Sequence, residues 1–422
     1  MSNVAQDHKY PKYRWVIAVL FILVTMLDLY FLAVTAPLMS SLMKEFNTSL
    51  TVMGYASTIV STFMGVFMFI GVVIIGKWGV KKCYIISCIA LLLGNLICML
   101  STNVEMFIAG RACIGIGFGV SGTLVASTVY MWFPPKERPM LFTANVMGSA
   151  FVQIVAYNIT VPLYNTFGIK PVFGVCMALS AVATLAWIIL GKEFDINAAE
   201  GKVADTRAIT AKAGAFDGLK LAFRSKELWV LTLFITCTTL ASNGTNFFYP
   251  TFLSQVRGLS PAVAGSITSV RFLGNTIGSL VGGAVAIALG RRKPIIMTAA
   301  FGLLIGYLSL FNLTYIPVLI AAMFFAGFMN LMTPAVQSAA LEVPNMTPAM
   351  AAGGNSMMYG FGSLLALFIS PILGGLSASI GLTGAMSAYV LTIIVIAAIA
   401  SFFFIDRGPK VKIKTKQASP AN

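Results

Sequence analysis

Three ionisable side chains lie deep inside long apolar stretches of this sequence, where they could do chemistry that a surface charge cannot. They are Asp28, Arg111 and Arg271. Burying a charge in an apolar membrane segment costs at least about 2.5–3.5 kcal/mol, so each is expected to face a partner, a cavity or a ligand. The chemistry open to them is proton transfer by the carboxylate and anion binding by the guanidinium groups.

Asp28 admits two interpretations. One is a fixed salt bridge with Arg111; the other is a proton carrier whose protonation responds to Arg111 and to a substrate. The sole histidine, His8, precedes the first apolar stretch. Asp28 is therefore the membrane-embedded candidate for proton coupling, and any proton-coupled transport should depend on it.

Arg271 points to an anionic ligand. Pairing Asp28 with one arginine leaves the other unpaired. The chain also contains an internal repeat, in which Val60 stands at the position equivalent to Arg271. Internal symmetry therefore does not require the arginine. A guanidinium near the middle of a span suits a carboxylate, a phosphate or another oxyanion, which it can hold with two parallel hydrogen bonds. The alternative is that Arg271 extends towards the membrane surface or binds helix carbonyl groups.

Amide and phenol groups accompany Arg271 in the stretches expected to line a central cavity, where they could orient a substrate without adding charge. Interhelical hydrogen bonding is the common use of such residues in membranes, but their clustering beside Pro250 favours cavity lining for residues 242–249. The candidate substrate-binding residues are Arg271, Asn243, Asn246, Tyr249, Tyr157, Gln153, Asn330, Asn355 and Tyr359.

The elements that must position these residues are membrane-spanning helices. Of the 422 residues, 58% are hydrophobic and 10% are charged, against about 25% charged in soluble domains. This excludes a soluble enzyme, a secreted disulfide scaffold and a disordered tail. Because a span needs about 20 apolar residues, the sequence predicts an all-α membrane protein with twelve helices at 15–39, 50–74, 82–102, 105–131, 140–164, 168–190, 228–252, 261–287, 294–313, 315–338, 349–375 and 380–404.

The basic residues predict the orientation. A net charge of +15 would suggest nucleic acid in a soluble protein. Placing both termini in the cytoplasm assigns 23 Lys and Arg to inner segments and 3 to outer loops, as the positive-inside rule requires. We therefore expect a multi-pass protein of a bacterial inner membrane with both termini cytoplasmic. Its partners would be the lipid bilayer and a small molecule, not nucleic acid, and we expect a monomer.

An internal repeat divides the chain into two halves. Ser49 and Gly54 in SLTVMG match Ser260 and Gly265 in SPAVAG at an offset of 211 residues, and Gly79 matches Gly290 at the same offset. The expected organisation is a six-helix bundle at 1–190, a cytoplasmic linker at 191–227, a second six-helix bundle at 228–405 and a basic tail at 406–422. In transporters built from two such halves, the substrate site lies near the midplane between them.

The sequence resembles the major facilitator superfamily along its whole length. The resemblance rests on the loop after the second span, VVIIGKWGVKK, and its copy GAVAIALGRRK, on RACIGIGFG in the fourth span, and on Asp28 nine residues before Pro37. It implies that cytoplasmic gate loops are formed by Lys77, Gly79, Lys81, Gly290, Arg291 and Arg292. The acidic residue that latches this gate in the family is absent from both copies, where Gly76 and Ile287 stand.

The resemblance implies a fold of two pseudo-symmetric six-helix bundles and a secondary active transporter that works by alternating access. With Arg271, the expected substrate is a small organic anion, moved in symport with protons or by exchange. One alternative is proton-coupled efflux of amphipathic compounds, although the Gly-Pro-x-x-Gly-Gly signature of drug exporters is absent from the fifth span. Another is a solute receptor of transporter-like fold. No metal cluster, cofactor motif or catalytic triad is visible, so an enzyme is not expected.

Overall fold

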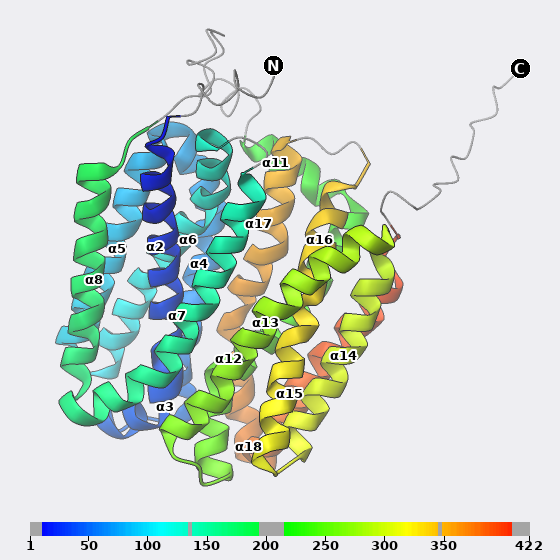
Figure 1. The fold of residues 1–422 in the computed structure, drawn as a ribbon. Helices are drawn as coiled ribbons and strands as arrows, with labels where there is room; N and C mark the ends of the chain where they lie inside the picture. Colours follow the sequence, from blue (N-terminus) through cyan, green and yellow to red (C-terminus); the bar gives the residue numbers. More distant parts are fainter. Residues whose placement is uncertain (1–10, 134–136, 194–214, 345–347, 407–422) are drawn as a thin grey trace, which may run out of the picture.

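The computed structural model describes residues 11–133, 137–193, 215–344 and 348–406. Within these ranges the chain is almost entirely helical and contains no strand, which confirms the predicted all-α fold class. The helices form two groups that stand side by side, the N-terminal group on the left and the C-terminal group on the right of Figure 1. The start of the first helix and the chain near Asp406 lie at the same end, called the inner end below; the opposite end is the outer end.

The N-terminal bundle contains α2 (Arg14–Ala33), α3 (Thr35–Glu45), α4 (Leu50–Trp78), α5 (Val80–Leu100), α6 (Val104–Trp132), α7 (Arg138–Phe167) and α8 (Ile169–Leu190). The first span is longer than the predicted 15–39, and it is divided at Val34 into α2 and α3. Pro37 explains the division, because its ring lacks an N–H and crowds the carbonyl four residues earlier, that of Ala33.

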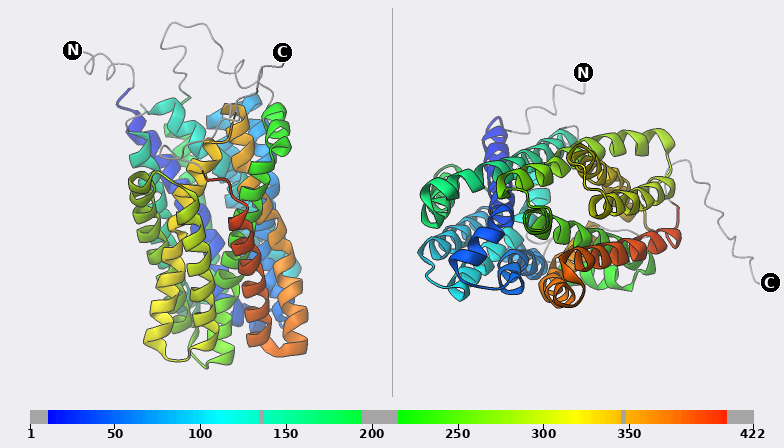
Figure 2. Two further views of the ribbon diagram at one scale, coloured as in Figure 1. Left: turned by 90° about the vertical axis from the view of Figure 1, so that its right-hand side faces the viewer. Right: turned by 90° about the horizontal axis from the view of Figure 1, so that it is seen from below.

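The C-terminal bundle follows the same pattern. It contains α12 (Lys226–Val256), α13 (Pro261–Leu289), α14 (Lys293–Asn312), α15 (Ile316–Phe328), the 3₁₀ turn η1 (Met329–Leu331), α16 (Met332–Leu341), α17 (Pro348–Leu364), η2 (Leu365–Phe368) and α18 (Ile369–Phe402). Figure 2 shows the two bundles from the side and from the outer end. The predicted tenth span is thus interrupted at Asn330, and the eleventh continues through η2 into α18.

Among the described residues, eleven helical segments are long and apolar enough to cross a membrane, against the twelve predicted. The difference arises at the C-terminal end, where Gly353–Phe402 contains both the eleventh and the twelfth predicted spans. They are divided at Gly381, whose φ of 72° is not helical. Gly168, with a φ of 79°, divides α7 from α8 in the same way. Both turns need a left-handed backbone, which glycine adopts without strain, and the structure is consistent with twelve crossings.

The predicted linker at 191–227 is described only at its ends. Residues 194–214 and the predicted tail after Asp406 lie outside the described residues. Near the end of the linker is a short helix that was not predicted, α11 (Ala215–Arg224), which packs against α17 at the inner end. The Phe223 ring lies 5.6 Å from that of Trp229 and 6.0 Å from that of Phe361. The end of the linker is therefore attached to the C-terminal bundle.

Glycines at every fourth position let α13 pack against the backbone of its neighbour. A Cβ on Gly274, Gly278 or Gly282 would meet the carbonyl oxygen of Phe324, Phe328 or Leu331, respectively. Residues four apart share one face of a helix, and small residues on such a face allow close helix contact in membranes. This stripe fixes α13 against α15 and η1.

Polar contacts join the two bundles in their middle and outer parts. Asn158 of α7 donates to Ser269 of α13 at 3.1 Å and accepts from Ser266 at 2.6 Å. On the other side of the interface, the hydroxyls of Thr58 in α4 and Ser370 in α18 lie 3.1 Å apart. The outer segment α3 also contacts α12 and α13. The outer ends are therefore closed against each other.

The glycine stripe generates a paired test of this packing. We expect Gly278→Val to destabilise the protein by about 2 kcal/mol or more, because the added atoms overlap the α15 backbone, which cannot move aside without separating the helices. Gly283→Val is the matched control, since a Cβ there has no neighbour within 4 Å. Thermal unfolding of the purified variants measures the difference. Equal melting temperatures for the two variants would contradict the close contact.

Candidate functional site

Arg271 is a buried charged residue of the C-terminal bundle. It lies on α13 one turn before the glycine stripe, and only 4% of its surface is exposed. Its Nη1 donates to the Asn246 side-chain oxygen at 2.6 Å, and its Nη2 donates to the Ser242 hydroxyl at 2.7 Å and to the Tyr307 hydroxyl at 3.3 Å. Three oxygens from α12 and α14 therefore set the plane of the guanidinium.

These partners orient the positive charge without neutralising it. All three acceptors are neutral, and no carboxylate of the described residues forms an ion pair with Arg271. Its Nε is buried and has no hydrogen-bond partner in the described part of the chain. A guanidinium held in this way has donors and charge available for an oxyanion.

The backbone contact that Arg271 makes with a neighbouring helix is repeated in the N-terminal bundle. The backbone carbonyl of Arg271 lies against Gly327, and the carbonyl of its repeat equivalent, Val60, lies against Gly115, the counterpart of Gly327. The same helix contact is thus made in both bundles, with valine at this position in one and arginine in the other. This backbone contact therefore does not itself require an arginine at the position.

Tyr157 of α7, in the N-terminal bundle, contacts residues beside Arg271. Its hydroxyl donates to the backbone oxygen of Asn246 at 2.6 Å, and its ring lies 5.3 Å from that of Phe272. The structure thus gathers Arg271, Asn246 and Tyr157 where α7, α12 and α13 meet. Tyr307 was missed because the ninth span was not expected to line the cavity. Its signal was a lone tyrosine in an otherwise largely apolar helix.

Tyr249 does not fit the expectation of cavity lining. It is fully buried, and its hydroxyl donates to the carbonyl of Leu310 at 3.0 Å. Its ring packs 5.4 Å from Phe252 and 6.1 Å from Phe311. The side chain therefore belongs to the packing of α12 against α14.

The other predicted polar residues are not joined to Arg271 by hydrogen bonds. Gln153 and Asn330 donate to carbonyls of their own helical segments, those of Ser149 and Gly327. The Tyr359 hydroxyl accepts from Gln337 at 3.1 Å. Asn355 is exposed, and Asn243 is half-buried; neither side chain makes a hydrogen bond within the described ranges.

Asp28 and Arg111 do not form the salt bridge that was one interpretation of the pair. Asp28 is 1% exposed; its Oδ2 accepts from the Ser121 hydroxyl at 2.6 Å, and its Oδ1 has no partner among the described residues. Ser121 is ten residues beyond Arg111 on α6, which is about 15 Å along the helix. Among the described residues no ion pair joins Asp28 to Arg111.

Arg111 instead binds the backbone where the first span is divided. Its Nη1 donates to the carbonyl of Phe31, and its Nη2 donates to the carbonyl of Leu32 at 3.2 Å and to the Thr35 hydroxyl at 3.1 Å. Its Nε donates to the carbonyl of Ala56 in α4 at 2.9 Å. The carbonyls near the end of α2 lack some of their helical partners, and Arg111 supplies donors to them.

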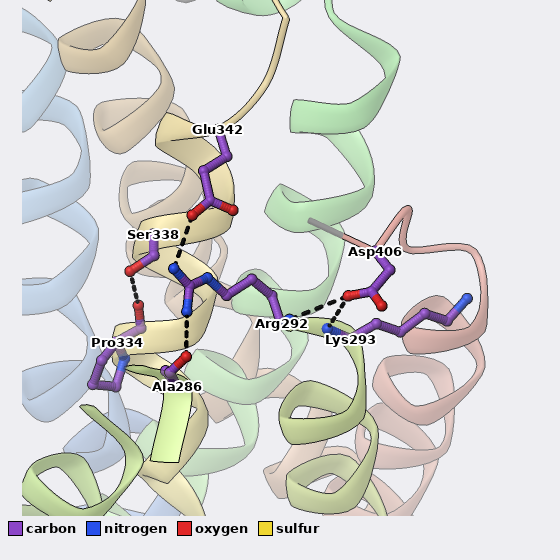
Figure 3. A network of polar contacts seen from close by, with 7 residues as sticks. All are labelled: Ala286, Arg292, Lys293, Pro334, Ser338, Glu342 and Asp406. Atoms are coloured by element: carbon purple, nitrogen blue, oxygen red, sulfur yellow. Dashed lines mark hydrogen bonds and ion pairs between the residues drawn. The ribbon is translucent and has the colours of Figure 1, made fainter. Parts of the chain in front are cut away.

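The predicted gate loop of the C-terminal half is held by acids from elsewhere in the chain. Asp406, after α18, accepts from Arg291 Nε at 2.7 Å. It also accepts from the backbone N–H groups of Arg292 and Lys293 at 3.1 and 3.0 Å (Figure 3). Glu342, after α16, pairs with Arg292 at 2.8 Å (Figure 3). These carboxylates give the basic residues of the loop acidic partners, and both contacts stay within the C-terminal bundle.

The loop of the N-terminal half shows a related arrangement. Gly79 has a φ of 79°, and a Cβ there would meet the carboxylate of Glu193, which follows α8. Gly290, its repeat equivalent, has a φ of 61° and ends α13. Lys81 lies in the first turn of α5, whereas the side chain of Lys77, in the last turn of α4, lies outside the described part of the chain.

A family model described as Major Facilitator Superfamily matches residues 20–263 and 233–421. The hexuronate transporter of Bacillus subtilis (strain 168) is 24% identical over 300 residues, which cover 67% of this chain and 69% of the relative. The probable galactarate/D-glucarate transporter GarP of Escherichia coli (strain K12) is 25% identical over 386 residues, covering 81% and 84%.

Two solved structures show the same fold. One is the crystal structure of a D-xylose-proton symporter, with a TM-score of 0.72, 17% identity and coverage of 93% of this chain and 97% of that chain. The other is the partially occluded inward-open xylose transporter XylE of Escherichia coli, with a TM-score of 0.73, 18% identity and coverage of 96% and 100%.

The contacts of Asp406 generate a pH-dependent prediction. Partial burial acts to raise the pKa of Asp406, but hydrogen bonds from Lys293, Arg291 and Arg292 hold it below its ordinary value. The stability that the carboxylate contributes is therefore present above the unfolded pKa and is lost as pH falls through the lower folded pKa.

We expect Asp406→Asn to lower the free energy of unfolding by about 1 kcal/mol at pH 7, as for a carboxylate at a helix N-terminus. The gap to the wild type should close below about pH 4. Thermal unfolding between pH 3 and pH 8 measures it, and a gap that is constant with pH would contradict the assignment.

Proposed function

The chain belongs to the Major Facilitator Superfamily of transporters, and on that premise we propose that it moves a small organic anion across the membrane by alternating access. The anion is a carboxylate, and transport proceeds in symport with protons or by exchange for another anion. In transporters of two repeated bundles, the substrate site lies near the midplane between the repeats. Arg271, where α7, α12 and α13 meet, is our candidate for that site.

The observation that carries this proposal is the uncompensated guanidinium of Arg271. A charge in a span is costly and normally has a partner, yet the acceptors around Arg271 are the neutral groups of Asn246, Ser242 and Tyr307. A substrate carboxylate supplies the missing negative charge. The amide and hydroxyl groups beside it can exchange hydrogen bonds with hydroxyls of the same substrate.

The named relatives support this substrate class. One is named a hexuronate transporter and another a probable galactarate/D-glucarate transporter. Hexuronates and aldarates are hydroxylated carboxylates, which combine the two features that the surroundings of Arg271 would recognise. D-Glucuronate and D-glucarate are therefore the first substrates to test.

Asp28 is the proposed site of proton coupling. An ionised carboxylate that is buried without a cation is strongly disfavoured, and Asp28 has a single donor, Ser121, and an unpartnered Oδ1 among the described residues. Such a group can hold a proton on Oδ1 in this conformation. It could release the proton when a conformational change admits water.

We expect Arg271→Ala and Arg271→Lys both to weaken D-glucuronate binding about 10- to 100-fold, because hydrogen bonds to a charged group contribute about 1.5–3 kcal/mol and lysine cannot reproduce the planar pair. Thermal stabilisation and proteoliposome uptake measure the loss. Full uptake by Arg271→Ala would refute the site.

A tyrosine pair supplies the control for Arg271. Tyr307→Phe removes a contact with the guanidinium and should weaken uptake, whereas Tyr249→Phe removes a bond to the carbonyl of Leu310 and should affect only stability.

Stabilisation of the wild type by cationic dyes rather than by carboxylates would favour efflux of amphipathic compounds. Binding without uptake would favour a receptor.

A second experiment tests the coupling. If transport is proton-coupled, Asp28→Asn should abolish accumulation driven by a pH gradient, because the asparagine side chain cannot take up and release an acid proton. The variant should still exchange labelled for unlabelled substrate. Glu45→Gln is the control, since Glu45 is an exposed carboxylate at the outer end. Proton-driven accumulation that survives Asp28→Asn would refute the role of Asp28. A wild type indifferent to the gradient would favour exchange.

A further inference from the structure

A cavity of about 460 Å³ lies at the outer end, at the junction of the two bundles. One wall comes from the end of α3 and the turn after it, and the other from the end of α12 and the turn that leads into α13. Its polar side chains are those of Ser40, Lys44, Asn47, Thr48, Ser254 and Gln255. It is separate from Arg271 and is not used by the proposed transport mechanism.

The internal repeat relates the two walls of this cavity to each other. The turn at 47–48 corresponds to 258–259 at the offset of 211 residues, so equivalent ends of the two halves face each other here. Gln255 is nine residues beyond Asn246 on α12, about 13 Å along the helix axis. Between these levels Gly265 packs on Tyr157 and Pro37. The cavity thus lies on the outer side of this contact between the bundles.

The charge of the cavity is positive and unshared. Lys44 is exposed and forms no ion pair within the described residues, and no Asp or Glu lines the cavity. The adjacent Glu45 accepts instead from the Tyr164 hydroxyl at 2.9 Å. One ammonium group surrounded by amides and hydroxyls suits a small hydroxylated carboxylate.

We propose that this cavity is a second anion site, which binds a small hydroxylated carboxylate only while the outer ends are closed. Its walls belong to different bundles, and alternating access must separate them. A ligand that contacts both walls stabilises the closed arrangement by its differential affinity. An external anion therefore opposes opening of the outer ends and slows uptake at high concentration. The choice of a carboxylate rests on the proposed function, but the site does not depend on Arg271.

The test is a titration of the protein in lipid nanodiscs with D-glucuronate, and with D-glucose as the neutral control. Spin labels at Thr102→Cys and Tyr315→Cys report the separation of the outer ends. Both positions are exposed, one in each bundle. The native cysteines are buried except for the half-buried Cys113, which is replaced by serine. Each titration is repeated with Arg271→Ala, which removes the central site from the measurement.

D-Glucuronate, but not D-glucose, should increase the population with short outer distances in the wild type and in Arg271→Ala. Lys44→Gln and Gln255→Ala, one from each wall, should each raise the half-maximal concentration about five- to tenfold, corresponding to about 1–1.4 kcal/mol. Lys170→Gln is the matched control, since it removes an exposed lysine outside the cavity and should leave the titration unchanged.

Three outcomes overturn the proposal. The shift could be lost in Arg271→Ala, which would assign it to the central site. Lys44→Gln and Lys170→Gln could behave alike, which would indicate a general charge effect. D-Glucose could act as D-glucuronate does, which would exclude anion selectivity. If carboxylate transport by way of Arg271 is itself wrong, uptake by Arg271→Ala shows it, while the Lys44-dependent shift still decides the outer site.

Discussion

A charged side chain stays in an apolar bundle only if protein atoms replace the water that it has lost, and this constraint organises the structure. Arg111 meets it with three backbone carbonyls and one hydroxyl, which fix α6 to the divided first span and to α4. Arg271 meets it with neutral side chains and keeps its charge available. Asp28 has one donor among the described residues. The two arginines therefore differ in role: Arg111 is bound mainly by fixed backbone groups, whereas Arg271 is bound by polar side chains that can change partners.

Small residues make these arrangements rigid. Gly115 and Gly119 bring α6, which carries Arg111 and Ser121, against the carbonyls of Val60 and Met64 in α4. The stripe of α13 does the same for the helix that carries Arg271. In a membrane the lipid tails are as apolar as leucine, so close packing of this kind rather than hydrophobic burial holds helices together. The close helix contacts that these glycines allow therefore fix where the buried charged side chains lie.

The sequence predicts the spans, the repeat and the buried charges because hydropathy and repeat spacing are local properties of the chain. It does not predict how each helix is rotated. Helices that are apolar all round have little hydrophobic asymmetry to indicate their inward face. Tyr249 and Asn246 therefore looked equivalent, although one packs against α14 and the other binds Arg271. The contacts of Asp406 with Arg291 and of Glu342 with Arg292 join residues 115 and 50 positions apart. No local sequence pattern contains such contacts.

The distribution of polar contacts sets the energy scale of a conformational cycle. At the inner end the described ion pairs lie within one bundle, as Arg14 with Glu137 and Arg292 with Glu342, so they can persist while the bundles move. At the outer end the bundles are joined by neutral hydrogen bonds of Asn158 and Thr58, each contributing about 0.5–1.5 kcal/mol. Hydrogen bonds to a charged group such as Arg271 contribute about 1.5–3 kcal/mol. The proposed binding of an anion at Arg271 would therefore be comparable in free energy to breaking the outer contacts. Ion pairs between the bundles would make those contacts harder to break.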